Sequence, residues 1–229
     1  MNARNWTGPL ESGDFPDQLR ARVISPGAEP RVHGYDVERD LAQHYRFTDV
    51  LLLLLTGELP SNGALAGLEV ALCFFAPVSV AHASTHASVL SRLCGASTSS
   101  TIGVSATALA EQARVTLAEH DELLRWSADD PLPARYVATD DANVGSVQRL
   151  KAALEKTGLV VPGLEQGPTR NAALILLLRA CGLKRKEQME SLLVLARLPA
   201  ALSEAFAERA TNFANYPINL PAFSYEEPT

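Results

Sequence analysis

Two histidines lie close together in a stretch that could take part in acid–base chemistry. His82 and His86 are separated by Ala-Ser-Thr, which places them one turn apart on a helix predicted over residues 83–95. A histidine in a pocket can polarise a carbonyl group or move a proton. The ordinary interpretation is that His82 begins the helix and meets solvent or the core, and the sequence by itself favours that interpretation.

The other residue patterns that carry chemistry are absent from the sequence. It has no glycine-rich phosphate loop, no metal-binding motif and no nucleophile turn. Three isolated cysteines, Cys73, Cys94 and Cys181, lie in apolar, helix-like surroundings. Such a scattered, odd set is typical of buried thiols in a reducing compartment. We therefore expect no metal site and no disulfide.

Composition narrows the class of protein and its location. The net charge of −6 argues against nucleic acid as a main partner, because no basic patch stands out. The longest apolar run, Val50 to Leu55, is far shorter than the roughly 20 residues that a membrane helix needs. No secretory signal opens the chain, so we expect a cytoplasmic protein with no membrane partner.

Periodicity and helix-end signals predict an all-α fold. Alanine and leucine dominate the apolar residues, as is typical of helical cores. Thr48 and Ser61 are expected to cap helices, and no strand is predicted. We expect an N-terminal arm over 1–30, one helical domain over 31–214 and an extended tail over 215–229. The helices are predicted at 36–45, 48–55, 61–76, 83–95, 101–126, 144–157, 171–181 and 186–211.

Two motifs in residues 30–60 point to a family. A Gly34-Tyr35-Asp36 turn opens one helix, and Thr56-Gly57-Glu58-Leu59-Pro60 closes the next, which is five leucines long. This arrangement resembles the N-terminal part of the citrate synthase family, and the chain length favours its short citryl-CoA lyase-like branch. The resemblance implies a dimer that joins, or splits into, an acyl-CoA and a 2-oxo acid such as oxaloacetate. A CoA thioester would then be the substrate or ligand, with no separate cofactor.

The resemblance also shows where catalytic residues are missing. The family's base is an aspartate before an apolar helix, and counting back from Gly182 puts its position at Asn171. An amide cannot act as a general base, so Asn171 is expected to be only a helix cap. The enol-stabilising histidine follows an Ala-rich helix in a His-Gly-Gly stretch, but its position falls on Arg114 or Thr116. Residues 106–125 contain no glycine or proline, so one uninterrupted helix is predicted there, with four residues toward the core: Leu109, Ala113, Leu117 and Leu124.

The remaining site residues are carried over with less support from the motifs. His82 is the candidate for the family's other histidine, with His86 as a second choice. Arg197 and Arg209 are candidate ligands for substrate carboxylates, although each is also typical of a solvated helix charge. His33 stands where the family's turn has an arginine.

The sequence therefore favours a catalytically degenerate citrate synthase/citryl-CoA lyase-like protein that acts as a structural or regulatory subunit or homologue. It would form a homodimer, or a heterodimer with an active paralogue, around the helices at 61–76, 83–95 and 101–126. Two alternatives stay open. One is an active citrate synthase-type acyltransferase or citryl-CoA lyase, and the other is an acyl-CoA or dicarboxylate sensor without turnover.

Overall fold

Helices dominate the part of the chain that the structure describes, so the all-α prediction is confirmed. The computed structural model describes residues 20–25 and 27–209. These residues divide into two compact units, one ending at Gly57 and the other beginning at Glu58. The expected tail over 215–229 and most of the expected arm over 1–30 lie outside the described residues. No helix within the described ranges is long and apolar enough to span a membrane.

The first unit contains three very short strands, so the prediction of no strand is wrong. β1 (Ile24–Ser25), β2 (Arg31–Val32) and β3 (Tyr35–Asp36) pair antiparallel in that order. His33 and Gly34 form the two-residue loop between β2 and β3, with φ of 46° and 91°. Such loops need positive φ, which a glycine adopts easily and a histidine does not. Strands of two residues are too short to show the alternation from which a strand is predicted.

Two helical segments complete the first unit. Asp36 caps one π-helical turn, η1 (Val37–Leu41), which continues into α1 (Ala42–His44). α2 (Phe47–Thr56) begins one residue earlier than predicted, so Thr48 is not its cap. Instead the Asp49 carboxylate accepts a hydrogen bond from the Arg46 backbone N–H at 2.8 Å. A carboxylate in the first turn also complements the positive end of the helix dipole.

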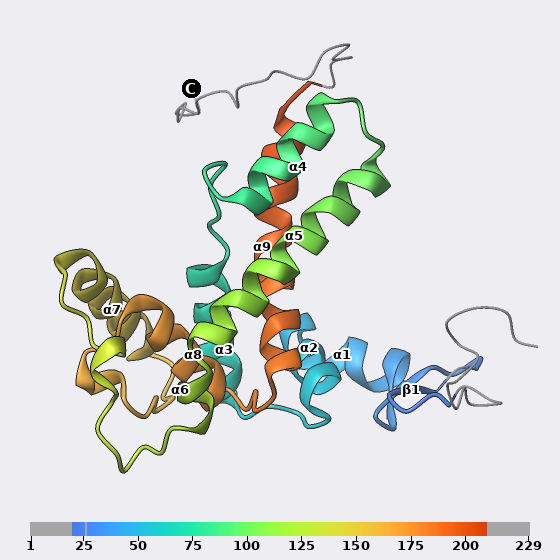
Figure 1. Ribbon diagram of the computed structural model, residues 1–229. Coiled ribbons are helices and arrows are strands. Elements are labelled where there is room, and N and C mark those ends of the chain that lie inside the picture. Colours follow the sequence, from blue (N-terminus) through green and yellow to red (C-terminus); the bar gives the residue numbers. More distant parts are fainter. Residues whose placement is uncertain (1–19, 26, 210–229) are drawn as a thin grey trace, which may run out of the picture. The chain divides into compact units, whose positions relative to one another are not determined.

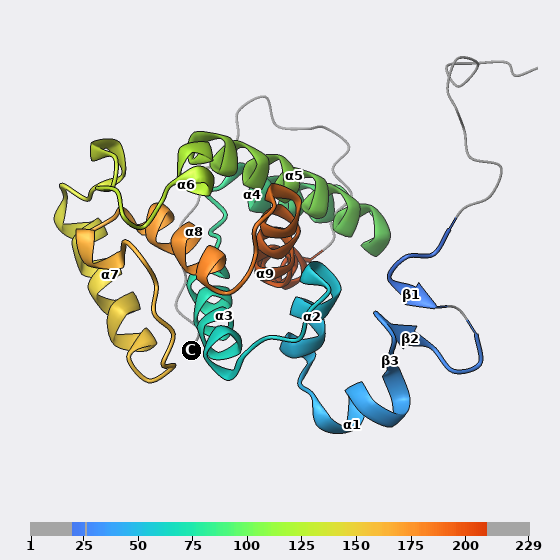
Figure 2. The same ribbon diagram turned by 90° about the horizontal axis from the view of Figure 1, so that it is seen from below.

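Three long helices of the second unit pack side by side, as Figures 1 and 2 both show. They are α4 (Ala83–Leu93), α5 (Thr98–Glu119) and α9 (Lys186–Ala207), and each contacts the other two. α9 ends at Ala207, four residues before its predicted end, where Glu208 turns to extended backbone. The apolar residues Leu109, Val78 and Ala201 form a buried cluster between these elements.

Hydrogen bonds between hydroxyl groups link α4 to α5. Ser105 donates to Ser88 Oγ at 2.6 Å, and Ser91 donates to Thr101 Oγ1 at 3.3 Å. Ser88, Ser105 and Thr101 are fully buried. Small side chains let two helix backbones approach closely, and their paired hydroxyls avoid the cost of buried unsatisfied donors.

The remaining helices surround one whose central residues are fully buried. α8 (Arg170–Ala180) has every side chain from Ala172 to Leu178 at most 2% exposed, which confirms the predicted buried helix. It contacts α3 (Asn62–Phe75), α7 (Asp141–Leu154) and α6 (Asp121–Arg125). The Ser61 hydroxyl caps α3 as predicted, accepting from Ala64 N at 3.3 Å. Two 3₁₀ turns, η2 (Ala134–Tyr136) and η3 (Leu164–Gln166), lie in the connections.

The helix predicted over 106–125 is interrupted. α5 ends at Glu119, His120 has φ of −111° and ψ of 19°, and α6 begins at Asp121. Leu109, Ala113 and Leu117 are buried as predicted. Beyond the break the helical phase changes, so the buried residue is Leu123 rather than the predicted Leu124.

Candidate functional site at the start of helix α8

The N-terminal end of α8 is fixed by the loops before it. Thr169 caps the helix through its hydroxyl, which accepts from Ala172 N at 3.4 Å, so the prediction that Asn171 is the cap is wrong. Thr169 N donates to Tyr136 O at 2.6 Å, and Arg170 N donates to the Asn143 side-chain oxygen at 2.9 Å. Asn171 is exposed in the first turn. This end of α8 therefore presents an amide and a guanidinium, but no carboxylate.

Two arginines meet beside this helix start, at the C-terminal end of α3. Arg170 donates to the Phe74 carbonyl, and Arg197 on α9 donates from Nε to the Phe75 carbonyl at 3.3 Å. The Arg197 guanidinium also lies over the Phe75 ring, 5.8 Å from its centroid. Both side chains are half-buried, and neither forms an ion pair with any residue that the structure describes. We call Arg170 and Arg197 the arginine pair.

The electrostatics of the arginine pair favour an anion. Loss of water on burial lowers the pKa of Arg170. Burial also lowers the pKa of Arg197, and the positive charge of Arg170 lowers it further. The two helix-end carbonyls offset part of this repulsion, because the C-terminal end of a helix carries partial negative charge. A carboxylate or phosphate between the two guanidinium groups would offset the rest through charge-assisted hydrogen bonds.

A buried histidine that the sequence analysis did not consider lies at the break between α5 and α6. His120 is 8% exposed, and its Nδ1 is 2.8 Å from the Thr116 carbonyl oxygen. Because a carbonyl only accepts, Nδ1 carries a hydrogen and Nε2 is the acceptor of the neutral ring. The imidazole stacks on Tyr136, with centroids 5.3 Å apart, and Tyr136 is the residue whose backbone binds Thr169.

The position of His120 carries a signal in the sequence. It follows the Ala-rich helix, whereas the resemblance puts the family's histidine position earlier, at Arg114 or Thr116. The composition predicts a continuous helix through His120, because no glycine or proline marks the break. The tertiary structure stabilises this break, since the Tyr136 hydroxyl donates to the Glu119 carbonyl at 3.1 Å.

The three histidines predicted as site residues do not join this group. His82 precedes the first residue of α4 and is exposed, with Nδ1 3.4 Å from the Gln112 side-chain nitrogen. His86, one turn on, has a buried Nε2 with no hydrogen-bond partner among the residues that the structure describes. His33 belongs to the first unit, where its ring packs against Gly57. No hydrogen bond or ion pair between described residues connects any of the three with the arginine pair.

The other basic candidates face solvent. Arg114 on α5 forms an exposed ion pair with Glu111 at 2.8 Å, and that hydrogen bond raises the pKa of the Arg114 guanidinium. Arg209 follows α9 and is exposed. Of the predicted anion ligands, only Arg197 has a partly buried position beside a second cation. No group of three metal-ligating side chains occurs within the described ranges.

Comparison with known proteins identifies the fold. No protein-family model and no curated protein matches the sequence. The chain is similar to the solved structure of citryl-CoA lyase from Hydrogenobacter thermophilus, with a TM-score of 0.66 and 14% identity, covering 92% of this chain and 97% of that one. It is also similar to ATP citrate lyase from Methanothrix soehngenii in complex with citrate and coenzyme A. That match has a TM-score of 0.55 and 15% identity, and covers 94% of this chain but 42% of that one.

These identities establish the fold and nothing finer. The chain has the helical fold of citryl-CoA lyase, as the motifs in residues 30–60 predicted. The roles expected for Asn171, Arg114, His82 and Arg197 stay predictions.

Proposed function

We propose that this chain is a catalytically degenerate protein of the citryl-CoA lyase fold that acts as a structural or regulatory subunit or homologue. The observation that carries the proposal is Asn171, which stands in the first turn of α8 where the family resemblance expects a carboxylate base. A side-chain amide has no basic atom near neutral pH. It therefore cannot take a proton from the α-carbon of a thioester.

Asp140 does not replace the missing base. It is linked to the start of α8 through Asn143, whose backbone and side-chain nitrogens donate to its two oxygens at 2.8 and 2.7 Å. These hydrogen bonds lower the pKa of the Asp140 carboxyl. A carboxylate stabilised in this way is a weaker base than an ordinary aspartate, and its role is to cap α7.

The arginine pair favours a second candidate function, which is recognition of a dicarboxylate or an acyl-CoA without turnover. Two adjacent guanidinium groups that lack a carboxylate partner among the described residues suit a ligand with more than one negative group. His120 is connected to the start of α8 through Tyr136, whose ring stacks on the imidazole and whose carbonyl accepts from Thr169 N. This sensor function is compatible with a regulatory subunit.

A dimer, either of two copies or with an active paralogue, is part of the proposal. α5 and α9 carry exposed large apolar side chains, each between 39% and 47% exposed: Ile102, Val104, Val115, Leu195 and Phe206. Burial of such residues against a second chain would be favourable. Co-purification of the tagged protein from its host, with mass measurement of the complex, distinguishes a homodimer from a heterodimer. A stable monomer with no recovered partner would exclude the subunit role.

Activity is tested by thiol release from acetyl-CoA with oxaloacetate, and by cleavage of citryl-CoA. We expect no turnover by the purified chain, since loss of a general base costs about 10²- to 10⁴-fold in rate. The variant Asn171→Asp restores the carboxylate, and Asn171→Ala is its control. Robust turnover by the unaltered chain would refute the degenerate assignment and identify an active acyl-CoA enzyme.

Ligand recognition is tested by calorimetry with citrate and with oxaloacetate. We expect Arg197→Gln and Arg170→Gln each to weaken binding by about tenfold or more, because each removes a charge-assisted hydrogen bond. Arg114→Gln is the matched control, since it makes the same change in charge at an exposed site. If neither acid binds the unaltered chain, recognition of a dicarboxylate fails and the structural role remains.

A further inference from the structure

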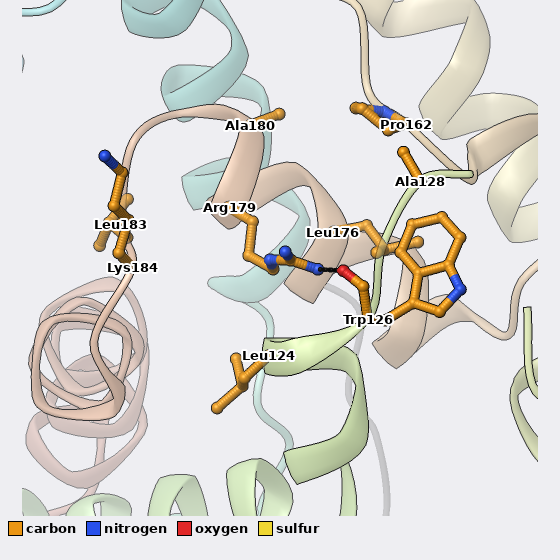
Figure 3. Close-up of a pocket in the computed structure, with 9 residues that line it drawn as sticks. All are labelled: Leu124, Trp126, Ala128, Pro162, Leu176, Arg179, Ala180, Leu183 and Lys184. Carbon is orange, nitrogen blue, oxygen red and sulfur yellow. Dashed lines mark hydrogen bonds between the residues drawn. The ribbon is translucent and has the colours of Figure 1, made fainter. Parts of the chain in front are cut away.

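A cavity of about 330 Å³ opens at the other end of α8. Figure 3 shows its walls, which come from the C-terminal half of α8, the residues after it, α6 and the loop that follows α6. Most of the lining is apolar, and the volume lies within the range of small-molecule pockets. The lining residues are Leu124, Trp126, Ala128, Pro162, Leu176, Arg179, Ala180, Leu183 and Lys184.

Arg179 is held rigidly in the wall of this cavity. Its Nη1 donates to the Leu123 carbonyl at 2.5 Å and to the Trp126 carbonyl at 3.1 Å, so the guanidinium caps the C-terminal end of α6. Figure 3 shows the side chain directed toward the backbone oxygen of Trp126, with the hydrogen bond between them drawn as a dashed line. These two bonds occupy both hydrogens of Nη1. Nε and Nη2 are left as a pair of parallel donors, the arrangement that binds a carboxylate through two hydrogen bonds.

The indole of Trp126 forms a fixed apolar wall. Its Nε1 donates to the Pro131 carbonyl at 3.2 Å, so the polar atom of the ring is already satisfied. Gly163 packs against the opposite edge so closely that an added Cβ would lie 2.7 Å from Trp126 Cη2. A ring held on two sides loses little freedom when a ligand binds, which favours affinity.

The charged side chains that line the cavity are all positive. Arg179 and Lys184 are its two ionisable lining residues, and no carboxylate is among the nine. Neither cation forms an ion pair with any side chain in the described ranges. We propose that this cavity binds a small organic anion in which one carboxylate is joined to a flat apolar body. The carboxylate binds Arg179 and is attracted by Lys184, while the apolar body packs between Trp126 and the leucines.

The cavity is distinct from the arginine pair. Arg170 is the first residue of α8 and Arg179 the last but one, nine residues apart, which corresponds to about 13 Å along a helix. The proposal therefore does not depend on the proposed function, and either can fail without the other.

Trp126 itself reports binding. In a Trp6→Phe background it is the single tryptophan of the chain, because the sequence contains two. We expect 3-phenylpropionate to change its fluorescence with saturation in the micromolar to millimolar range. The neutral analogue 3-phenylpropanamide keeps the apolar body and lacks the charge. Its affinity is therefore expected to be lower by about tenfold or more. Equal binding of the acid and the amide, or saturation by neither, would overturn the proposal.

Two variants locate the carboxylate. Arg179→Lys keeps the charge but loses the paired donors, and should weaken the binding of 3-phenylpropionate by about tenfold. Lys184→Ala changes an exposed side chain that does not support the fold. It should weaken the binding of 3-phenylpropionate by about two- to fivefold. Lys156→Ala, an exposed lysine outside the cavity, is the matched control and should leave binding unchanged. If Arg179→Lys does not fold, Lys184→Ala is the deciding variant. An affinity of Lys184→Ala for 3-phenylpropionate equal to that of Lys156→Ala would then overturn the proposal.

Discussion

Replacement of Gly163 by alanine should destabilise the second unit far more than the same change at Gly158. Both glycines have left-handed backbone, with φ of 82° and 68°. For a residue with a Cβ this conformation costs about 1–2 kcal/mol. At Gly158 nothing lies within 4 Å of the added atom, so that conformational cost is the whole expected effect.

Gly163 adds a steric cost. The new Cβ would lie 2.7 and 3.0 Å from two atoms of the Trp126 ring and 3.2 Å from Leu176 Cδ1. The ring cannot move away freely, because its Nε1 is bound to the Pro131 carbonyl. Forcing an extra methyl group into a packed site costs about 1–3 kcal/mol. We therefore expect Gly163→Ala to lower the free energy of unfolding by about 2–5 kcal/mol in total.

Urea unfolding followed by far-ultraviolet circular dichroism measures the difference between the two variants. With a slope of about 2 kcal/mol per molar urea, an extra 2 kcal/mol moves the midpoint down by about 1 M relative to Gly158→Ala. The fluorescence of Trp126 should also change in Gly163→Ala and not in the control. Equal midpoints for the two variants would show that the ring is not clamped, and would remove one support of the cavity proposal.

Three further outcomes follow from single contacts. Thr169→Ala should lower the free energy of unfolding by about 1 kcal/mol through loss of the α8 cap. Asn171→Ala should lower it by about 0.5 kcal/mol or less. Equal losses for the two variants in chemical unfolding would contradict the assigned cap. Because the pKa of Asp140 is lowered on folding, its contribution to stability is present above the ordinary carboxyl pKa of 3.8 and is lost as the pH falls through the lower folded value. The stability difference between the unaltered chain and Asp140→Ala, measured by urea unfolding at neutral and acidic pH, should therefore shrink in acid, and a constant difference would refute that assignment. Burial raises the pKa of the Cys181 thiol to about 12, so a thiol reagent at mildly alkaline pH should label it only after denaturant is added, in contrast to the two exposed cysteines, Cys73 and Cys94.

Local signals in the sequence were sufficient for most helices. The Ser61 hydroxyl begins α3, and the apolar run before Gly182 forms the buried helix α8. The motifs around Gly34 and Gly57 led to the citryl-CoA lyase fold that the comparisons support. These features depend on residues a few positions apart, whose hydrogen bonds and burial are set within one helix.

The errors arose where distant contacts override local preference. Residues 106–125 have a helical composition throughout, yet α5 breaks at His120, where Tyr136 binds the last carbonyl of that helix. Asn171 is a good cap by residue type, but the Tyr136 carbonyl binds the N–H of Thr169, and the cap is Thr169, two residues earlier. In both cases a residue of the connection after α6 decides the outcome.

The sequence by itself determined the helical class and most helix positions, and it led to the prediction that Asn171 stands in place of a catalytic carboxylate. Only the tertiary structure brought Arg170 and Arg197 together, from two different helices, on the two carbonyls that end α3. It also placed Arg179, Lys184 and Trp126 around one cavity. The physical reason is that helix formation depends on neighbours along the chain, whereas the charge and shape of a site depend on how separate helices pack against one another.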